Sequence, residues 1–250
     1  MKMLVACKRV PDPSTKIRVK QDGSGIDAEG VKFVISALDE VAIEEGLKVK
    51  ERRGGEVILF SLGPPQAEDQ LRTGLAMGAD RGILIAYEGF TDSDLVARAL
   101  AAVFREERPD LILLGKVSPD TDAGQVGQLA AEYLALPQAT FASKIDLQAD
   151  DAKAVVTREV GGGHEQVEIQ LPAVITCDFR LNTPRYASLP MIMKAKGKPV
   201  RKVSLEELGV EAIPKVKVLK LLAPAKRAEG VRVDSVEELL RRLREEAKVF

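Results

Sequence analysis

The fold is decided by one stretch near the middle of the chain, Leu111-Ile112-Leu113-Leu114-Gly115-Lys116-Val117-Ser118-Pro119-Asp120-Thr121-Asp122-Ala123-Gly124-Gln125. Its first four residues are apolar without polar alternation, which is typical of a strand covered on both faces of a parallel sheet. A loop of small and polar residues follows, and Asp122 is a suitable cap for a helix. The stretch therefore predicts a strand, a loop and a helix of an α/β fold.

Three more apolar runs on its N-terminal side have the same character. They alternate with segments in which apolar residues recur at helical spacing. The predicted strands are Met3–Cys7, Val57–Phe60 and Gly82–Ala86, and the predicted helices begin at Ser36 with Asp39 in a capping box, near Gln66 before Gly78, and at Thr91 with Asp94. This alternation predicts a doubly wound, mainly parallel sheet.

The remaining segments indicate antiparallel pairing. From Thr140 onward we expect an antiparallel extension with strands at Ala154–Val160, Val167–Leu171 and Val174–Cys177. Nearer the N-terminus, Ile17–Val19 and Val31–Val34 flank the turn residues Asp22–Gly25 and predict a hairpin at the sheet edge. After Pro184 we expect a strand at Val216–Leu221 and a terminal helix capped by Ser235.

Composition excludes several classes of protein. Lys and Arg total 37 against 38 for Asp and Glu, so the net charge of -1 gives no global field for nucleic acid or an anionic membrane. No apolar run approaches the ~20 residues needed to cross a bilayer. Only Met3–Cys7 is apolar near the N-terminus, which is too short for a secretory signal. We expect a cytoplasmic protein with neither membrane insertion nor nucleic-acid binding.

The cysteines and the single histidine also point away from catalysis. Cys7 and Cys177 each lie in an apolar run and are predicted to be small buried side chains. His164 follows Gly161, Gly162 and Gly163, which is typical of a tight hairpin. A zinc site or a histidine-dependent triad would need partners that the chain lacks.

Ligands of parallel sheets bind beyond the carboxyl ends of the strands, so the loops there are the candidate site. Two loops stand out, Lys8–Ser14 and Gly115–Gln125. The second suits a nucleotide better, because its small residues let backbone N–H groups approach a phosphate near the helix expected at Asp122. Lys8 or Lys116 adds positive charge. The alternative is that the glycines serve turns and packing, since neither a Walker A motif nor G-x-G-x-x-G is present.

A second candidate surface is Thr183–Lys196, here called the recognition segment. It combines two prolines with apolar and basic side chains, a mixture often used to dock a partner. The alternative is a connection packed on its own domain.

Several motifs resemble the electron-transfer flavoprotein beta subunit, over nearly the whole chain. They are Lys8–Asp12, Asp39–Glu45, Ala76–Arg81, Pro137–Ser143, Leu171–Val174, Leu181–Pro190 and Met193–Lys196. The resemblance implies a Rossmann-like, adenine-nucleotide-binding fold in a heterodimer whose alpha subunit holds most of the FAD. It implies an electron carrier and not an enzyme, relaying electrons from acyl-CoA and other dehydrogenases to a quinone oxidoreductase.

The resemblance also assigns site residues. Contacts to a structural AMP are implied for Ala6, Ser36, Ala37, Leu38, Asp39, Leu62, Gly115, Lys116, Val117, Ser118, Pro119, Asp120, Thr121, Asp122, Ala123, Gly124, Gln125 and Val126. Pro13 and Leu38 correspond to positions near the flavin. Partner recognition is implied for Tyr186, Leu189, Pro190, Met191, Ile192, Met193 and Lys194, with Leu189 as the anchor.

The resemblance divides the chain at residue 182. Residues 1–182 would form the α/β nucleotide-binding domain with its antiparallel strands, and residues 183–250 the recognition segment and a C-terminal arm. Many relatives carry Asn-Pro at Ser36-Ala37, so backbone contacts are expected to matter most there. Two alternatives stay open: an electron-bifurcating subunit with a second FAD in place of AMP, and a stand-alone nucleotide-binding regulatory protein. Pro137–Ser143 favours the AMP-binding group.

Overall fold

A computed structural model describes residues 1–149, 151–225 and 229–250. The chain forms two compact units. The first contains residues 1–17 and 28–218, and the second contains residues 18–27 and 219–250.

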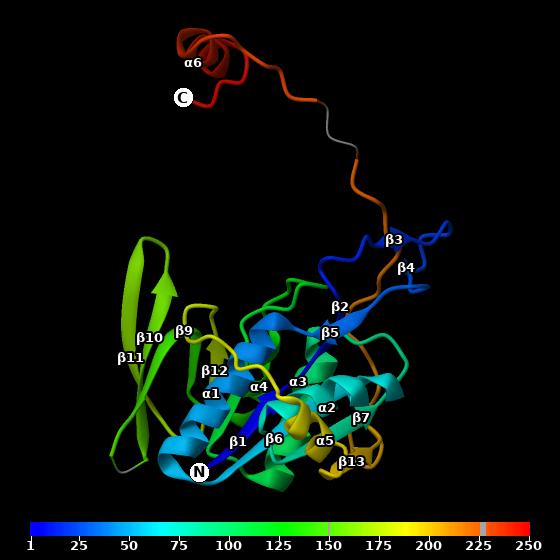
Figure 1. Cartoon of the computed structure of the whole chain (residues 1–250), viewed down its shortest axis with the longest axis vertical. Helices are drawn as coiled ribbons and strands as arrows, with labels where there is room; N and C mark the ends of the chain where they lie inside the picture. The colour runs from blue at the N-terminus through cyan, green and yellow to red at the C-terminus, as the bar shows by residue number, and fades with distance from the viewer. Residues whose placement is uncertain (150, 226–228) are drawn as a thin grey trace. The chain divides into compact units, whose positions relative to one another are not determined.

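The first unit is built on a nine-stranded sheet with the order β11-β10-β9-β12-β8-β1-β6-β7-β13 (Figure 1). Its strands are β1 (Lys2–Ala6), β6 (Glu56–Gly63), β7 (Arg81–Ala86), β8 (Leu111–Gly115), β9 (Gln138–Leu147), β10 (Lys153–Val160), β11 (Gly163–Gln170), β12 (Ala173–Cys177) and β13 (Val200–Val203). Every neighbouring pair is parallel in the part of the sheet that runs β9-β12-β8-β1-β6-β7-β13. The α/β fold with a mainly parallel sheet is confirmed.

Helices cover both faces of this sheet, so the doubly wound arrangement is also confirmed. α1 (Ala37–Arg53) and α2 (Glu68–Met77) share one core with Met3 and Val5 of β1, while α3 (Ser93–Glu107) and α4 (Val126–Leu134) share the other core with Leu4. Successive side chains of a strand point to opposite faces, which explains why this apolar strand lacks polar alternation.

The helix ends follow the sequence signals closely. A short turn η1 (Pro65–Ala67) leads into α2, which stops at Gly78 with a φ of 138°. α3 is capped by Asp92, whose side chain accepts a hydrogen bond from the N–H of Leu95 at 2.8 Å. The prediction of a cap at Thr91 is therefore wrong by one residue.

The antiparallel extension is confirmed only in part. β10 pairs antiparallel with both β9 and β11, and His164 lies exposed in that hairpin, opposite Glu159. The predicted antiparallel strand at Val174–Cys177 is wrong, because β12 lies parallel between β8 and β9. All five residues of β12 are buried, as expected for a strand inside a sheet covered on both faces.

The predicted N-terminal hairpin exists with a different partner. β3 (Arg18–Val19) pairs with β4 (Ile26–Asp27), whereas β5 (Phe33–Ile35) pairs antiparallel with β2 (Arg9–Pro11). The connection between β3 and β4 is shorter than the one between the two predicted runs, so closing it costs less chain entropy. Pairing of the predicted runs Ile17–Val19 and Val31–Val34 is therefore wrong.

The second unit contains the β3–β4 hairpin and the C-terminal residues. The predicted strand at Val216–Leu221 is wrong, because residues 216–221 have no strand assignment, although the N–H of Leu221 donates to the carbonyl of Gly23 at 2.9 Å. The terminal helix α6 (Val236–Glu245) is confirmed, with the Ser235 hydroxyl accepting from the N–H of Glu238 at 3.1 Å.

Candidate functional site

The candidate site lies where the order of the parallel strands reverses. From β1 the chain adds β6 and β7 on one side, and then adds β8 and β12 on the other side. In open parallel sheets a ligand-binding crevice is expected at such a switch point, beyond the carboxyl ends of the two diverging strands, here β1 and β8. The two loops singled out in the sequence, Lys8–Ser14 and Gly115–Gln125, follow these two strands.

Asp39 in the first turn of α1 ties the two loops together. Its carboxylate accepts hydrogen bonds from the backbone N–H of Lys8 at 2.8 Å and of Gly115 at 2.9 Å. The side chain is buried, and burial raises its pKa while the two N–H groups oppose that shift. The predicted capping box is wrong, because Ser36 makes no side-chain cap and Asp39 bonds to other strands' loops instead.

Gly115 is required by the close approach of α1 to the end of β8. A Cβ atom at this position would lie 2.6 Å from the Cβ of Leu38 and 3.0 Å from an Asp39 carboxylate oxygen. Both neighbours are buried and cannot swing aside. Gly115 is therefore needed both for the packing of α1 on β8 and for the shape of the candidate site.

Two lysines bring positive charge to the rim. The Lys8 ammonium lies 2.9 Å from the Ser118 hydroxyl and 2.8 Å from an Asp120 carboxylate oxygen, inside the loop after β8. The Lys116 ammonium lies 2.6 Å from an Asp178 carboxylate oxygen and 5.0 Å from the ring centre of Phe141.

Asp178 and Phe141 were not found from the sequence. Burial works to raise the pKa of Asp178, but the hydrogen bonds from Lys116 and from the N–H of Arg180, together with the positive charges of these two residues, lower the pKa. Asp178 directly follows β12, so recognising β12 as a parallel strand would have placed it at the same sheet edge.

The loop after β8 is shaped by two residues with left-handed backbone. Asp122 has a φ of 49° and Gly124 a φ of 59°, and the N–H of Asp122 donates to the carbonyl of Ser118 at 2.8 Å. The predicted helix start near Asp122 is wrong, because α4 begins at Val126 after Gln125. The Gln125 side chain does not cap this start, which leaves its first backbone N–H groups suited to an anion.

The other predicted nucleotide residues lie at the same sheet edge. Ala6 ends β1, Leu62 is near the end of β6, and Ser36 immediately precedes α1. The Ser36 hydroxyl is buried and has no hydrogen-bond partner in the part of the chain that the structure describes. An unpaired buried hydroxyl is costly unless a further group satisfies it.

The two positions predicted to be near a flavin have different surroundings. Leu38 is buried beside Gly115, whereas Pro13 is exposed in the turn after β2.

The recognition segment includes the short helix α5 (Leu189–Ala195), which packs on α2. Most of its apolar side chains are exposed: Tyr186 by 98%, Leu189 by 79%, Met193 by 63% and Ile192 by 43%. Pro190 and Lys194 are exposed and Met191 is half-buried. The segment therefore presents the predicted recognition residues on the surface of the first unit.

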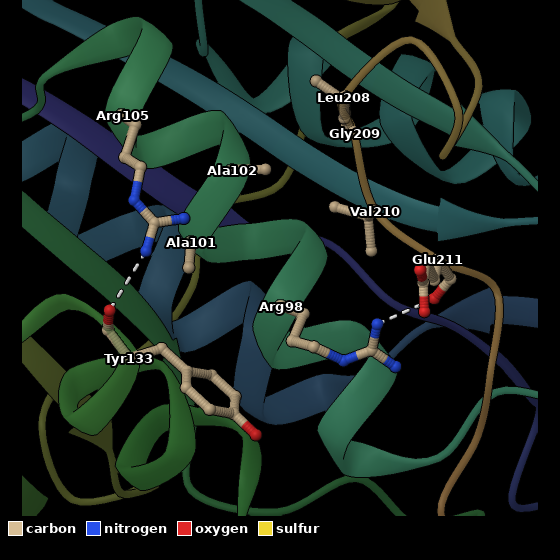
Figure 2. A pocket seen from close by; sticks show the side chains of 9 residues that line it. All are labelled: Arg98, Ala101, Ala102, Arg105, Tyr133, Leu208, Gly209, Val210 and Glu211. Carbon is tan, nitrogen blue, oxygen red and sulfur yellow. Dashed lines mark hydrogen bonds between the residues drawn. The ribbon is translucent and has the colours of Figure 1, made fainter.

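A separate hollow of about 430 Å³ lies beside α3 (Figure 2). Arg98 and Arg105 of α3, Tyr133 of α4 and residues 208–211 line it, and Arg98 donates to the Glu211 carbonyl at 2.7 Å. Close to it, Asp94 accepts hydrogen bonds from Tyr133, Arg98 and Lys215. Burial works to raise the pKa of Asp94, but these bonds together lower it to about 2. The bond from Lys215 holds the chain after β13 against α3.

Comparison with known proteins settles the family. A family model described as the electron transfer flavoprotein domain matches residues 24–208. The protein named electron transfer flavoprotein subunit beta of Bradyrhizobium diazoefficiens is 49% identical, over 100% of both chains. The chain belongs to the electron transfer flavoprotein subunit beta family. The protein named electron transfer flavoprotein subunit beta, mitochondrial, of Arabidopsis thaliana is 49% identical over 100% of both chains. The electron transfer flavoprotein subunit beta of Mus musculus is 44% identical over 100% of this chain and 99% of its own.

Membership of the electron transfer flavoprotein subunit beta family confirms the resemblance seen in the motifs. It makes the chain a subunit of an electron-transfer flavoprotein. Among the described residues, no helix is long and apolar enough to span a membrane, and no group of three His, Cys, Asp or Glu side chains is placed to hold a metal ion. Cys7 and Cys177 are free and buried, and burial raises the pKa of both thiols.

Proposed function

We propose that this chain pairs with an electron-transfer flavoprotein alpha subunit and binds AMP in the crevice between β1 and β8. In this proposal the pair relays electrons from acyl-CoA and related dehydrogenases to a quinone oxidoreductase, through an FAD held mostly by the alpha subunit. The main support for an AMP site here is the Asp39 carboxylate, which accepts hydrogen bonds from the loops after both strands at the switch point.

The residues at this crevice fit a nucleoside monophosphate. The uncapped start of α4 offers backbone N–H groups and a positive dipole end to the phosphate, and Lys8 stands beside the same loop. The buried Ser36 hydroxyl without a partner suits a further hydrogen bond to the ligand. Asp39 keeps the loops in place and is already occupied, so its role is to shape the site.

The role of this chain toward the flavin is to cover and orient it. FAD supplies the capacity to accept and release one or two electrons, and the protein positions it and excludes water. Leu38 at the start of α1 and Pro13 in the exposed turn after β2 are the residues proposed to approach it. No side chain of this subunit is proposed to make or break bonds.

The recognition segment is proposed to dock the dehydrogenases. Leu189 projects from the start of α5 and is 79% exposed, which suits insertion into an apolar pocket of a partner. Leu189→Ala is expected to reduce electron transfer from the dehydrogenases without loss of flavin. Unchanged rates with every dehydrogenase tested would rule out the anchor role.

One experiment tests the nucleotide assignment. The chain is co-expressed with the alpha subunit, purified as the native complex and denatured, and the released nucleotides are identified by mass spectrometry. We expect one FAD and one AMP per pair. Two FAD molecules would support the bifurcating alternative, and a colourless homodimer with a nucleotide would support the regulatory alternative.

A further inference from the structure

The first residues of the recognition segment are fastened to α1 by a forked ion pair. The Arg185 guanidinium donates to both carboxylate oxygens of Glu44, at 2.7 and 3.0 Å, and to both oxygens of Glu51, at 2.6 and 3.2 Å. The backbone N–H of Arg185 adds a bond to Glu44 at 3.2 Å. Glu44 is buried, so its charge-assisted bonds to Arg185 are shielded from water, whereas the bonds to Glu51 lie at the surface; the forked geometry fixes direction as well as distance.

Asn182 adds a second attachment just before the segment. Its side-chain amide donates to the backbone carbonyl of Val41 at 3.1 Å and to the carboxylate of Glu45 at 3.2 Å. Glu45 is also buried and pairs with Arg52 at 3.1 Å. Two successive buried carboxylates of α1 are thus used to hold the chain that leads into the recognition segment.

The other end of the segment is fastened to α2. Arg72 donates to the backbone carbonyls of Ala195 at 3.0 Å and Lys198 at 2.6 Å. The Lys198 ammonium in turn donates to the carbonyls of Leu75 at 2.9 Å and Ala79 at 2.5 Å. Ala195 is buried between these attachments.

Between the two attachments most of the large apolar side chains are exposed. Tyr186 directly follows Arg185 and is 98% exposed, and Leu189 is 79% exposed. If its ends were free, an exposed stretch whose only regular structure is the short helix α5 would lose conformational entropy each time it bound a partner. Fastening both ends to rigid helices removes part of that cost before binding.

We propose that Arg185 is a positioning residue that holds the recognition segment in its docking conformation before a partner arrives. Glu44 acts with it at the same end of the segment, and Arg72 acts at the other end. This inference rests on the proposed function, because it assumes that the segment docks dehydrogenases. Arg185 contacts neither nucleotide nor flavin in this scheme, and acts only through the segment that carries Leu189.

The test compares Arg185→Gln and Arg185→Lys with a matched control in the complex with the alpha subunit. Arg201→Gln is the control, because Arg201 also pairs with a glutamate, Glu106 at 2.8 Å, but on β13. An acyl-CoA dehydrogenase reduces the flavoprotein, whose concentration is varied, and flavin absorbance reports the rate. For Arg185→Gln we expect KM for the flavoprotein to rise about tenfold, with kcat within about twofold, since a tenfold change corresponds to about 1.4 kcal/mol.

The conservative variant and the control sharpen the expectation. Arg185→Lys keeps the charge but loses the fork, so we expect a KM rise of about threefold. Hydrogen exchange of backbone amides at residues 183–196 should accelerate in the same order, and Arg201→Gln should match the wild type in both measurements. If Arg185→Gln does not fold, Glu51→Gln removes only the exposed half of the pairing and should raise KM about twofold.

The outcomes separate this inference from the proposed function. If Leu189→Ala raises KM while the Arg185 variants leave KM and amide exchange unchanged, the positioning role is wrong and the docking role stands. If neither Leu189→Ala nor the Arg185 variants change KM, the docking role fails and the inference falls with it. A fall in kcat with unchanged KM for Arg185→Gln would also overturn the positioning role.

Discussion

The substitution Gly115→Ala adds one methyl group at the point where α1 meets the end of β8. The new Cβ would lie 2.6 Å from the Cβ of Leu38, whereas ordinary contact begins at 3.4 Å, so the two elements must separate by about 0.8 Å. Backbone of α1 and β8 has to make this movement, because the Leu38 atom that is met is a Cβ and not the end of a flexible side chain.

The separation acts on stability in two ways. Overpacking of a buried contact costs about 1–3 kcal/mol. The movement also lengthens the 2.9 Å hydrogen bond from the N–H of Gly115 to the buried Asp39 carboxylate, and a hydrogen bond to a charged group is worth about 1.5–3 kcal/mol. Because the bond is weakened and not removed, we expect the free energy of unfolding to fall by about 2–4 kcal/mol.

Urea unfolding followed by far-ultraviolet circular dichroism measures this change, and Gly161→Ala is the matched control. A Cβ at Gly161 meets nothing within 4 Å, so this second glycine-to-alanine change should leave stability within about 0.5 kcal/mol. Calorimetry with AMP should also show weaker binding only for Gly115→Ala. Equal unfolding midpoints for the two variants would refute the argument that close packing of α1 on β8 builds the site.

Three further changes follow from other contacts. The pKa of Asp94 is lowered to about 2, so its ionised form stabilises the fold above about pH 4, and this contribution is lost as the pH falls through about 2. Asp94→Asn should therefore lower the free energy of unfolding by about 2 kcal/mol at pH 7 and change it little at pH 2, as measured by urea unfolding. Lys8→Gln should weaken AMP binding about tenfold and reduce its salt dependence, with stability changed by less than about 1 kcal/mol, as titration calorimetry and urea unfolding would report. Ser235→Ala should destabilise α6 by about 1 kcal/mol and accelerate amide exchange in its first turn.

The sheet and the place of the site could be predicted because they depend on short-range patterns. Continuous apolar runs such as Leu111–Leu114 are sufficient to predict parallel strands, and the carboxyl-end rule then selects the loops that contain Lys8 and Gly115. These predictions require no knowledge of which side chains meet. They hold because parallel strands covered by helices leave few other arrangements.

The failures concern contacts between distant residues. Ser36 and Asp39 have the spacing of a capping box, yet Asp39 is drawn to the N–H groups of Lys8 and Gly115, which local spacing cannot reveal. Val174–Cys177 follows an antiparallel hairpin along the chain but returns to the centre of the sheet. That return brings Asp178 to Lys116, so one misplaced strand also concealed a residue of the site.

The position of β13 gives the exposed segment an engineering advantage. β12 and β13 are five strand spacings apart, about 24 Å at ~4.8 Å each, and residues 178–199 connect them across α1 and α2. A connection of this length can extend to about 70 Å, so it contains roughly threefold more chain than the crossing needs. Its surface residues can therefore be exchanged or lengthened between the attachments at Arg185 and Ala195 without pulling on either strand. The same subunit scaffold could be adapted to new electron donors by replacing this short stretch alone.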